Sequence, residues 1–198
     1  MSTSDRRVLL VDTAIDLIAT RGIRSLTHRA LDTALDLPAG SSSYYFRTRR
    51  ALLVGVADRI AERSRADFSA TGPSRDISGT EHTADPDLVA RAIARWVDRL
   101  LAERGNHLIA RHVLLAELRA DPELRAQLAH SLFSVERARE LFLAKGSADP
   151  ETAAADFVAV LEGAVFDRFT GNRAHLAPGT RASLDQLTNL FAVYLRAR

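Results

Sequence analysis

The sequence contains no cysteine, and Lys145 is its only lysine. Without cysteine the chain can form neither a disulfide framework nor a thiolate site, which fits a reducing compartment. No apolar run approaches the ~20 residues of a membrane span, and the N-terminal MSTSDRR lacks the apolar core of a signal peptide. These absences favour a cytoplasmic protein.

The sequence also lacks the short motifs that mark common catalytic and cofactor sites. It has no Gly-x-Gly-x-x-Gly, P-loop, Gly-x-Ser-x-Gly, His-Glu-x-x-His or di-iron Glu-x-x-His pattern. His107 and His112 are five residues apart and do not share a helical face, so a shared metal is not expected. We therefore predict no catalytic residues, no cofactor and no metal site.

Apolar residues recur with the helical period throughout the chain, and no strand signal interrupts them. A length of 198 residues and a hydrophobic content of 46% suffice for one or two domains with a real core. We predict an all-α fold of about nine helices. The expected helices span about residues 6–21, 27–35, 39–44, 49–70, 85–104, 107–119, 121–145, 152–170 and 181–196.

The most informative stretch runs from Thr27 to Leu53, THRALDTALDLPAGSSSYYFRTRRALL. Thr27 suits the N-cap of a short helix whose apolar stripe is Ala30, Leu31, Ala34 and Leu35. Asp36-Leu37-Pro38 ends this helix, because Asp tolerates the left-handed conformation of a turn and Pro suits the start of the next helix. Helix, short turn and helix form the helix-turn-helix plan.

The second helix of this pair, Ala39 to about Tyr44, is made of small residues that bury little. Serines at 41–43 are poor helix-interior residues, but small side chains let a helix sit deep in the DNA major groove. Tyr44 and Tyr45 then supply phenolic donors, and Arg47, Arg49 and Arg50 supply cations, as phosphate binding requires. The composition therefore favours a DNA-reading helix over a purely structural helical hairpin.

The charge distribution agrees with this interpretation. Residues 1–65 contain 11 arginines and seven acidic residues, a net charge of +4, whereas the other 133 residues carry a net charge of −2. The positive part is the part with the helix-turn-helix, as expected for a module that faces phosphates.

These residues resemble the DNA-binding segment of the TetR (tetracycline-repressor-like) family of bacterial regulators. The resemblance rests on T-x-x-x-L-x-x-A-L-D-L-P-A-G-S-x-x-Y-Y-F-x-T-R-x-x-L, and on a preceding helix that ends at Gly22 before Leu26 and Thr27. It covers residues 6 to about 56. Three positions depart from the family pattern: Asp36 stands for the usual glycine, Ser43 for the first tyrosine, and Arg49 for the lysine that opens the fourth helix.

The resemblance implies double-stranded operator DNA as a partner, with Ser41 and Ser42 nearest the bases and the tyrosines and Arg49 on phosphates. It divides the chain into a DNA-binding domain, 1–48, and an effector-binding and dimerisation domain, 49–198, which share the fourth helix. A mobile loop is expected at about 71–87. The expected DNA contacts are Thr27, His28, Arg29, Gly40, Ser41, Ser42, Ser43, Tyr44, Tyr45 and Arg49.

The family plan also implies a small-molecule effector in the C-terminal bundle and a homodimer formed by the last two helices. The expected effector contacts are Trp96, Leu100, Arg111, His112, Leu115, Phe133, Phe157 and Leu161. The expected dimer contacts are Val158, Val165, Phe169, Leu187, Phe191 and Tyr194. The two wide apolar faces of these last helices support burial on more than one side.

Other interpretations stay open from the sequence alone. The aromatic residues of the bundle can be ordinary core, the charged residues a solvated face, and the last helices the core of a monomer. The predicted function is a ligand-responsive transcriptional regulator, most simply a repressor that an effector releases from DNA. The alternative functions are a helical small-molecule-binding or interaction protein that does not read DNA, and an α-helical enzyme of unfamiliar type.

Overall fold

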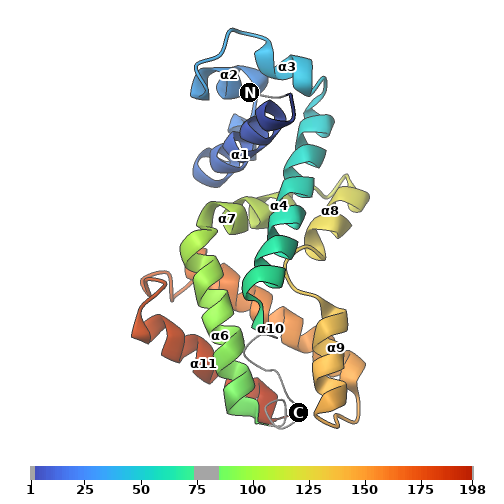
Figure 1. The fold of residues 1–198 in the computed structure, drawn as a ribbon, viewed down its shortest axis with the longest axis vertical. Coiled ribbons are helices and arrows are strands. Elements are labelled where there is room, and N and C mark those ends of the chain that lie inside the picture. The colour runs from blue at the N-terminus through green and yellow to red at the C-terminus, as the bar shows by residue number, and fades with distance from the viewer. Residues whose placement is uncertain (1–2, 74–84, 198) are drawn as a thin grey trace. The chain divides into compact units, whose positions relative to one another are not determined.

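The computed structural model describes residues 3–73 and 85–197, and all regular structure in them is helical (Figure 1). These ranges hold ten α-helices and one 3-10 helix. The all-α prediction is confirmed. By their internal contacts the residues form two compact units, Met1–Arg65 with Asn106–Leu132 and Ala66–Gly105 with Phe133–Arg198.

The first unit packs three N-terminal helices with the start of a long helix and with two later helices. Its elements are α1 (Thr3–Arg21), η1 (Ile23–Ser25), α2 (His28–Ala34), α3 (Ser41–Tyr45), the beginning of α4 (Arg49–Thr71), most of α7 (Gly105–Glu117) and α8 (Pro122–Ala129). One core joins Ile15 of α1, Val56 of α4, Leu114 of α7 and Leu128 of α8. The boundary of this unit therefore differs from the predicted boundary at residue 48.

Local sequence signals set the helix ends in this unit. The Thr27 hydroxyl accepts a hydrogen bond from Ala30 N at 3.0 Å, and the Thr48 hydroxyl accepts one from Ala51 N at 3.1 Å. Asp36 has φ 50° and Gly22 has φ 78°, the left-handed conformations expected after each helix. The helix expected at about residues 6–21 begins earlier, because residues 3–5 form the first turn of α1.

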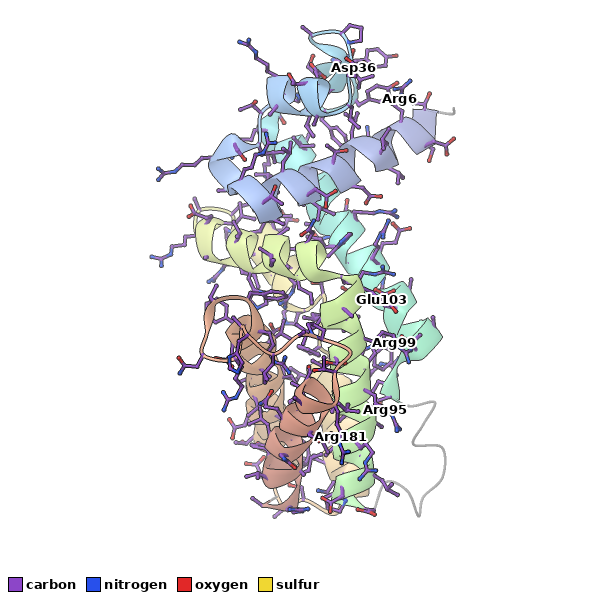
Figure 2. All side chains as sticks on the ribbon, turned by 90° about the vertical axis from the view of Figure 1, so that its left-hand side faces the viewer. Arg6, Asp36, Arg95, Arg99, Glu103 and Arg181 are labelled. Carbon is purple, nitrogen blue, oxygen red and sulfur yellow. The ribbon has the colours of Figure 1, made fainter. Side chains whose placement is uncertain are left out.

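The second unit is a bundle of α6 (Pro86–Glu103), α9 (Val135–Ala144), α10 (Pro150–Thr170) and α11 (Arg181–Arg196), with the last turns of α4. In it α6 packs along α11, and α9 packs along α10 (Figure 1). Arg95, Arg99 and Glu103 lie along one exposed side of α6 (Figure 2). The interior holds an aromatic cluster of Phe142, Phe157, Phe191 and Tyr194, in which Phe157 stacks on Tyr194 and the other contacts are edge-to-face.

A buried polar group fixes the register of three helices in this unit. Arg168 of α10 donates to the Ser183 hydroxyl of α11 at 2.8 Å, and that hydroxyl donates in turn to the Asp98 carboxylate of α6. All three side chains are buried. Buried polar groups hydrogen-bonded in this way specify one packing arrangement, because any other leaves them without partners.

Two expectations about helix boundaries need correction. The predicted helix 121–145 is two helices, because α8 ends at Ala129 and Ser134 caps a new helix by accepting from Arg137 N at 3.2 Å. Three residues of the predicted loop at 71–87 are helical, since Thr71 still belongs to α4, and Pro86 and Asp87 already belong to α6. Its residues 74–84 lie outside the described part of the chain.

Candidate nucleic-acid interface and ligand cavity

A buried carboxylate of α2 accepts hydrogen bonds from the N-terminus of α3. Gly40 N donates to Asp32 Oδ2 and Ser42 N donates to Asp32 Oδ1, both at 2.8 Å. Asp32 is 2% exposed. Burial alone raises the pKa of this carboxyl, but the hydrogen bonds from Ser42 and Gly40 outweigh burial and lower the pKa. Asp32 is not among the predicted site residues, because its position five residues after Thr27 carries no local signal.

Ser42 links the same two helices from the other side. Its hydroxyl donates to the His28 carbonyl oxygen at 3.1 Å and lies 3.2 Å from His28 Nδ1. The side chain is fully buried. This burial contradicts the expectation that Ser42 contacts a base edge, because its hydroxyl already donates to His28 of α2.

The remaining predicted DNA contacts lie at or near the surface of the helix-turn-helix. Tyr44 is 79% exposed, and its ring meets the edge of Tyr45 at a centroid distance of 5.3 Å. The Ser41 and Ser43 hydroxyls bond the carbonyls of Pro38 and Gly40, at 2.6 and 2.7 Å, and keep their acceptor capacity. The exposed or half-buried members of the set are Thr27, His28, Arg29, Gly40, Ser41, Ser43, Tyr44, Tyr45 and Arg49.

Two arginine side chains donate hydrogen bonds to backbone carbonyls of other segments in this module. Arg49, the first residue of α4, donates to the carbonyls of Leu26 at 2.6 Å and Ile23 at 2.8 Å. Arg7 of α1 donates to the Tyr45 carbonyl at 2.9 Å and stacks over the Phe46 ring at 4.5 Å. Each guanidinium has five donors, so both keep N–H groups that can meet a phosphate.

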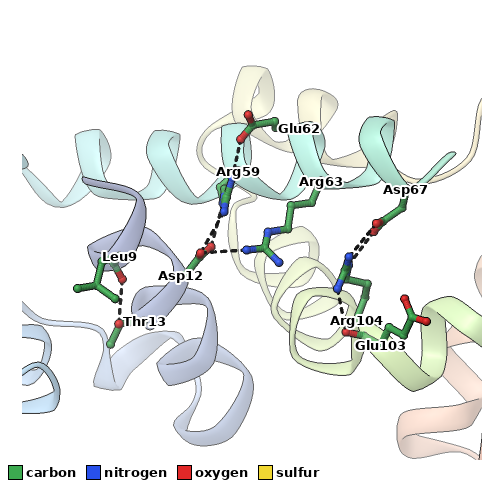
Figure 3. Close-up of polar contacts among 9 residues, drawn as sticks. All are labelled: Leu9, Asp12, Thr13, Arg59, Glu62, Arg63, Asp67, Glu103 and Arg104. Atoms are coloured by element: carbon green, nitrogen blue, oxygen red, sulfur yellow. Dashed lines mark hydrogen bonds and ion pairs between the residues drawn. The ribbon is translucent and has the colours of Figure 1, made fainter. Parts of the chain in front are cut away.

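Within the first unit α1 is joined to α4 by an ion-pair cluster (Figure 3). Asp12 accepts from Arg59 Nε at 2.9 Å and from Arg63 at 3.0 Å, and Arg59 also pairs with Glu62. Burial raises the pKa of Asp12, but the two arginines more than compensate and lower it. The three-helix module is therefore fixed to α4 by charge as well as by its apolar core.

The second unit contains a cavity of about 300 Å³, near the lower end of the usual range for small-molecule sites. Its wall includes Phe68, which lies near the end of α4. Of the predicted effector contacts, Trp96, Phe133, Phe157 and Leu161 line it. Asp67, next to Phe68, is held by Arg104 through two hydrogen bonds of 2.8 Å (Figure 3).

The other predicted effector contacts do not line this cavity. Arg111, His112 and Leu115 belong to the first unit, and Leu100 is buried without reaching the cavity wall. The Arg111 guanidinium is 1% exposed and donates to the Leu128 and Ala129 carbonyls at 2.9 and 3.0 Å. It caps the C-terminal end of α8. This role could not be predicted from the sequence.

The predicted dimer contacts are mostly interior. Val165, Leu187 and Phe191 are fully buried within one chain, and Val158 lines the cavity. Phe169 and Tyr194 are half-buried, and Tyr194 donates to the Ala153 carbonyl at 3.0 Å. The large apolar side chains exposed on α10 and α11 are instead Phe166, 52% exposed, and Val193, 67% exposed.

Residues 84–190 match the family model described as the tetracyclin repressor-like C-terminal domain, which is more than half of the chain. The chain belongs to this family. The family model covers most of the second unit, which contains the cavity, and also α7 and α8 of the first unit. The sequence resemblance covers residues 6 to about 56. The two observations together span most of the protein.

Two solved structures resemble most of the chain. The multidrug binding protein EbrR, complexed with ethidium, is 26% identical, with a TM-score of 0.61, over 93% of this chain and 98% of that chain. A TetR-family member (SCO1917) from Streptomyces coelicolor A3 is 24% identical, with a TM-score of 0.65, over 93% and 97%. These likenesses support the all-helical TetR fold.

A shorter match concerns a helix-turn-helix protein. An uncharacterized HTH-type transcriptional regulator in the dhlA 5' region of Xanthobacter autotrophicus is 37% identical over 54 residues. The match spans only 27% of each chain.

Two features are absent from residues 3–73 and 85–197. No helix in these ranges combines the length and the apolar character that a membrane crossing needs. The same ranges bring together no group of three or more His, Cys, Asp or Glu side chains suited to a metal ion.

Proposed function

We propose that this TetR-family protein is a ligand-responsive transcriptional regulator, a repressor that a small-molecule effector releases from operator DNA. The observation that carries the proposal is the span of α4. Its first residue, Arg49, bonds the turn before α2, and Phe68, near its end, forms part of the cavity wall. A ligand that moves Phe68 therefore acts on the helix that carries the DNA-binding module.

The module proper is residues 1–48, and residues 49–198 form the effector-binding and dimerisation part, with α4 common to both. Because Asp12 fixes α1 to Arg59 and Arg63, the module follows any tilt of α4 as one piece. A ligand shifts the population between conformers only through a difference in its affinity for them. The conformer favoured by the effector is the one in which two recognition helices no longer fit their half-sites.

In the DNA complex, α3 lies in the major groove. Exposed Tyr44, half-buried Tyr45 and exposed Arg49 contact phosphates, which fixes the register of the protein on DNA. Ser41 and Ser43 lie nearest the bases, and Gly40 allows close approach of the backbone. Thr27, His28 and Arg29 at the start of α2 contact the neighbouring phosphates. Ser42 positions α3 and does not contact DNA.

The active species is a homodimer that matches half-sites about 34–36 Å apart. Exposed Phe166 of α10 and Val193 of α11 lie at the centre of its interface, since burying both removes the largest apolar surface of these helices from water. A cavity of about 300 Å³ lined by aromatic rings suits a small aromatic effector.

The test is a fluorescence-anisotropy titration of the full chain on DNA from immediately upstream of its own gene, with a scrambled duplex as control, at two salt concentrations. A specific regulator binds the first duplex at least ~10³-fold more tightly, and both affinities fall steeply with salt. Equal, weak binding to both duplexes and to duplexes selected from random sequence would identify a helical ligand-binding protein that does not read DNA.

A further inference from the structure

The cavity of the second unit combines apolar walls with two hydrogen-bond donors. Trp96 makes edge-to-face contacts with Phe68 and with Phe133, at centroid distances of 5.4 Å and 5.6 Å and interplanar angles of 88° and 81°. Phe157 and Leu161 of α10 complete the apolar wall. Rings at right angles to each other leave flat faces and edges that suit a planar ligand.

The first donor is the indole N–H of Trp96. Trp96 is 5% exposed and lines the cavity, and its Nε1 has no hydrogen-bond acceptor among the described residues. A buried donor without a partner destabilises the protein, so nearly all such donors have one. An acceptor atom on the ligand would supply that partner.

The second donor is the guanidinium of Arg137. It is exposed at the edge of the same cavity and lies over the Phe68 ring, with Cζ 4.5 Å from the ring centroid. Both donors thus adjoin the same ring, Phe68. An arginine stacked on an aromatic ring has its planar donors pre-oriented, and it binds carboxylates through paired hydrogen bonds.

We infer that the cavity binds a flat, largely apolar molecule that carries a carboxylate or another hydrogen-bond-accepting oxygen, with its body among the three rings. Trp96 donates to the acceptor oxygen and Arg137 neutralises its charge. This inference rests on the proposed function, since it names the chemistry of the effector. Glu140 also lines the cavity and is exposed, so a cationic ligand is the competing class.

Three probes with one ring system separate these classes: 2-naphthoate, 2-naphthamide and 2-naphthylmethylammonium. They differ only in the head group, which is an anionic acceptor, a neutral acceptor or a cationic donor. Each is titrated into the full chain by calorimetry at 25 °C. We expect 2-naphthoate to bind at least about 10-fold more tightly than the ammonium, because only the acceptor satisfies both donors.

Two substitutions assign the donors. Arg137→Gln should weaken 2-naphthoate about 10-fold or more and leave 2-naphthamide within about threefold, because only the first needs the cation. Trp96→Phe keeps an aromatic side chain but removes the N–H and part of the indole surface, so it should weaken both acceptors more than it weakens the ammonium. Arg99→Gln is the matched control, because Arg99 lies on the exposed side of α6 and does not line the cavity. It should change the affinity for neither acceptor probe. Thermal unfolding of each variant checks that it is folded.

The wild-type comparison of probes needs no variant, so a variant that fails to fold does not spoil the test. Equal or tighter binding of the ammonium, or no heat from any probe up to about 1 mM, would overturn the inference. The operator titration is run separately. A chain that binds its operator but prefers the ammonium keeps the proposed function and loses only the inference, whereas a chain that binds no specific DNA loses the proposed function.

Discussion

The Asp32 carboxylate accepts the backbone N–H of Ser42 at 2.8 Å, across the turn of the helix-turn-helix. Its second oxygen accepts the Gly40 N–H at the same distance. Two of the N–H groups that a helix leaves without partners at its start are thus satisfied by the preceding helix. The five residues of α3 are too few to be a stable helix alone, so α2 sets the position of the DNA-reading surface.

Removal of this carboxylate should misplace α3. We expect Asp32→Ala to cost about 1–3 kcal/mol of stability, since two buried N–H groups lose their acceptor. DNA affinity measured by anisotropy should fall by more than tenfold. Asp36→Asn in the exposed turn is the control, because Asn keeps the left-handed conformation at that position. Normal DNA binding by Asp32→Ala would show that α3 does not depend on Asp32.

Acid should lower the free energy of unfolding, because it protonates the carboxylates of Asp32 and Asp12. Both have a folded-state pKa below the ordinary value of 3.8, so the unfolded chain binds more protons between the two values. Their contribution is therefore complete above pH about 5 and is lost as pH falls through the lower, folded-state values. Urea unfolding midpoints from pH about 6 to about 2.5 should fall in acid, and less so for Asp32→Asn. An identical acid dependence in that variant would contradict this assignment.

Tyr44→Phe should separate DNA positioning from folding. Tyr44 is 79% exposed, so loss of its hydroxyl should change stability by less than about 0.5 kcal/mol. Affinity for operator and scrambled DNA should fall together, because a phosphate contact carries no sequence information. Ser43→Ala should instead alter sequence preference, and Ser42→Ala should reduce stability, since its hydroxyl bonds α2. Loss of operator binding alone in Tyr44→Phe would place Tyr44 on a base.

The pair of Asp12 and Arg59 should be energetically coupled. The two side chains are 28% and 19% exposed and are joined at 2.9 Å. A double-mutant cycle with alanines, read by urea unfolding, should give a coupling of about 1–3 kcal/mol. The control pair is Arg181 and Asp185 on α11, which is 94% and 62% exposed, and its coupling should not exceed about 0.5 kcal/mol. Equal couplings would mean that the Asp12 pair does not fix α1 to α4.

The dimer proposal is tested on α10 and α11. A Phe166→Glu, Val193→Glu double variant should remain folded, because both side chains are exposed, but should sediment as a monomer and bind operator weakly. Leu143→Glu is the matched control, since Leu143 of α9 is 48% exposed and lies on another helix. A dimeric double variant would place the interface elsewhere.

Features that depend on neighbouring residues in the chain could be predicted from the sequence. Thr27, Asp85, Asp149 and Thr180 all cap helices as their side chains suggest, because capping is local chemistry. The break between α8 and α9 was missed, since Leu132 and Val135 continue the apolar pattern across it. A hydrophobic repeat alone does not distinguish one helix from two.

Roles that depend on distant residues could not be predicted. The periodicity correctly indicated that Trp96, Phe133 and Phe157 are buried, and the structure places them on one cavity wall. It gave no sign that Arg111 would cap α8, or that Ser42 would turn inward to His28. Such partners are 14 to 17 residues apart, and a helical pattern specifies a face without specifying what packs on it.

The core that joins Ile15 and Val56 to Leu114 and Leu128 also sets an order for synthesis of the chain. A ribosome that has released 65 residues has made every helix of the DNA-binding module, yet α7 and α8, which cover part of its core, are still to come. The nascent module therefore keeps apolar surface open until about residue 132 has emerged. A fragment cut at residue 65 would carry the same uncovered surface and should aggregate, whereas the complete chain covers it.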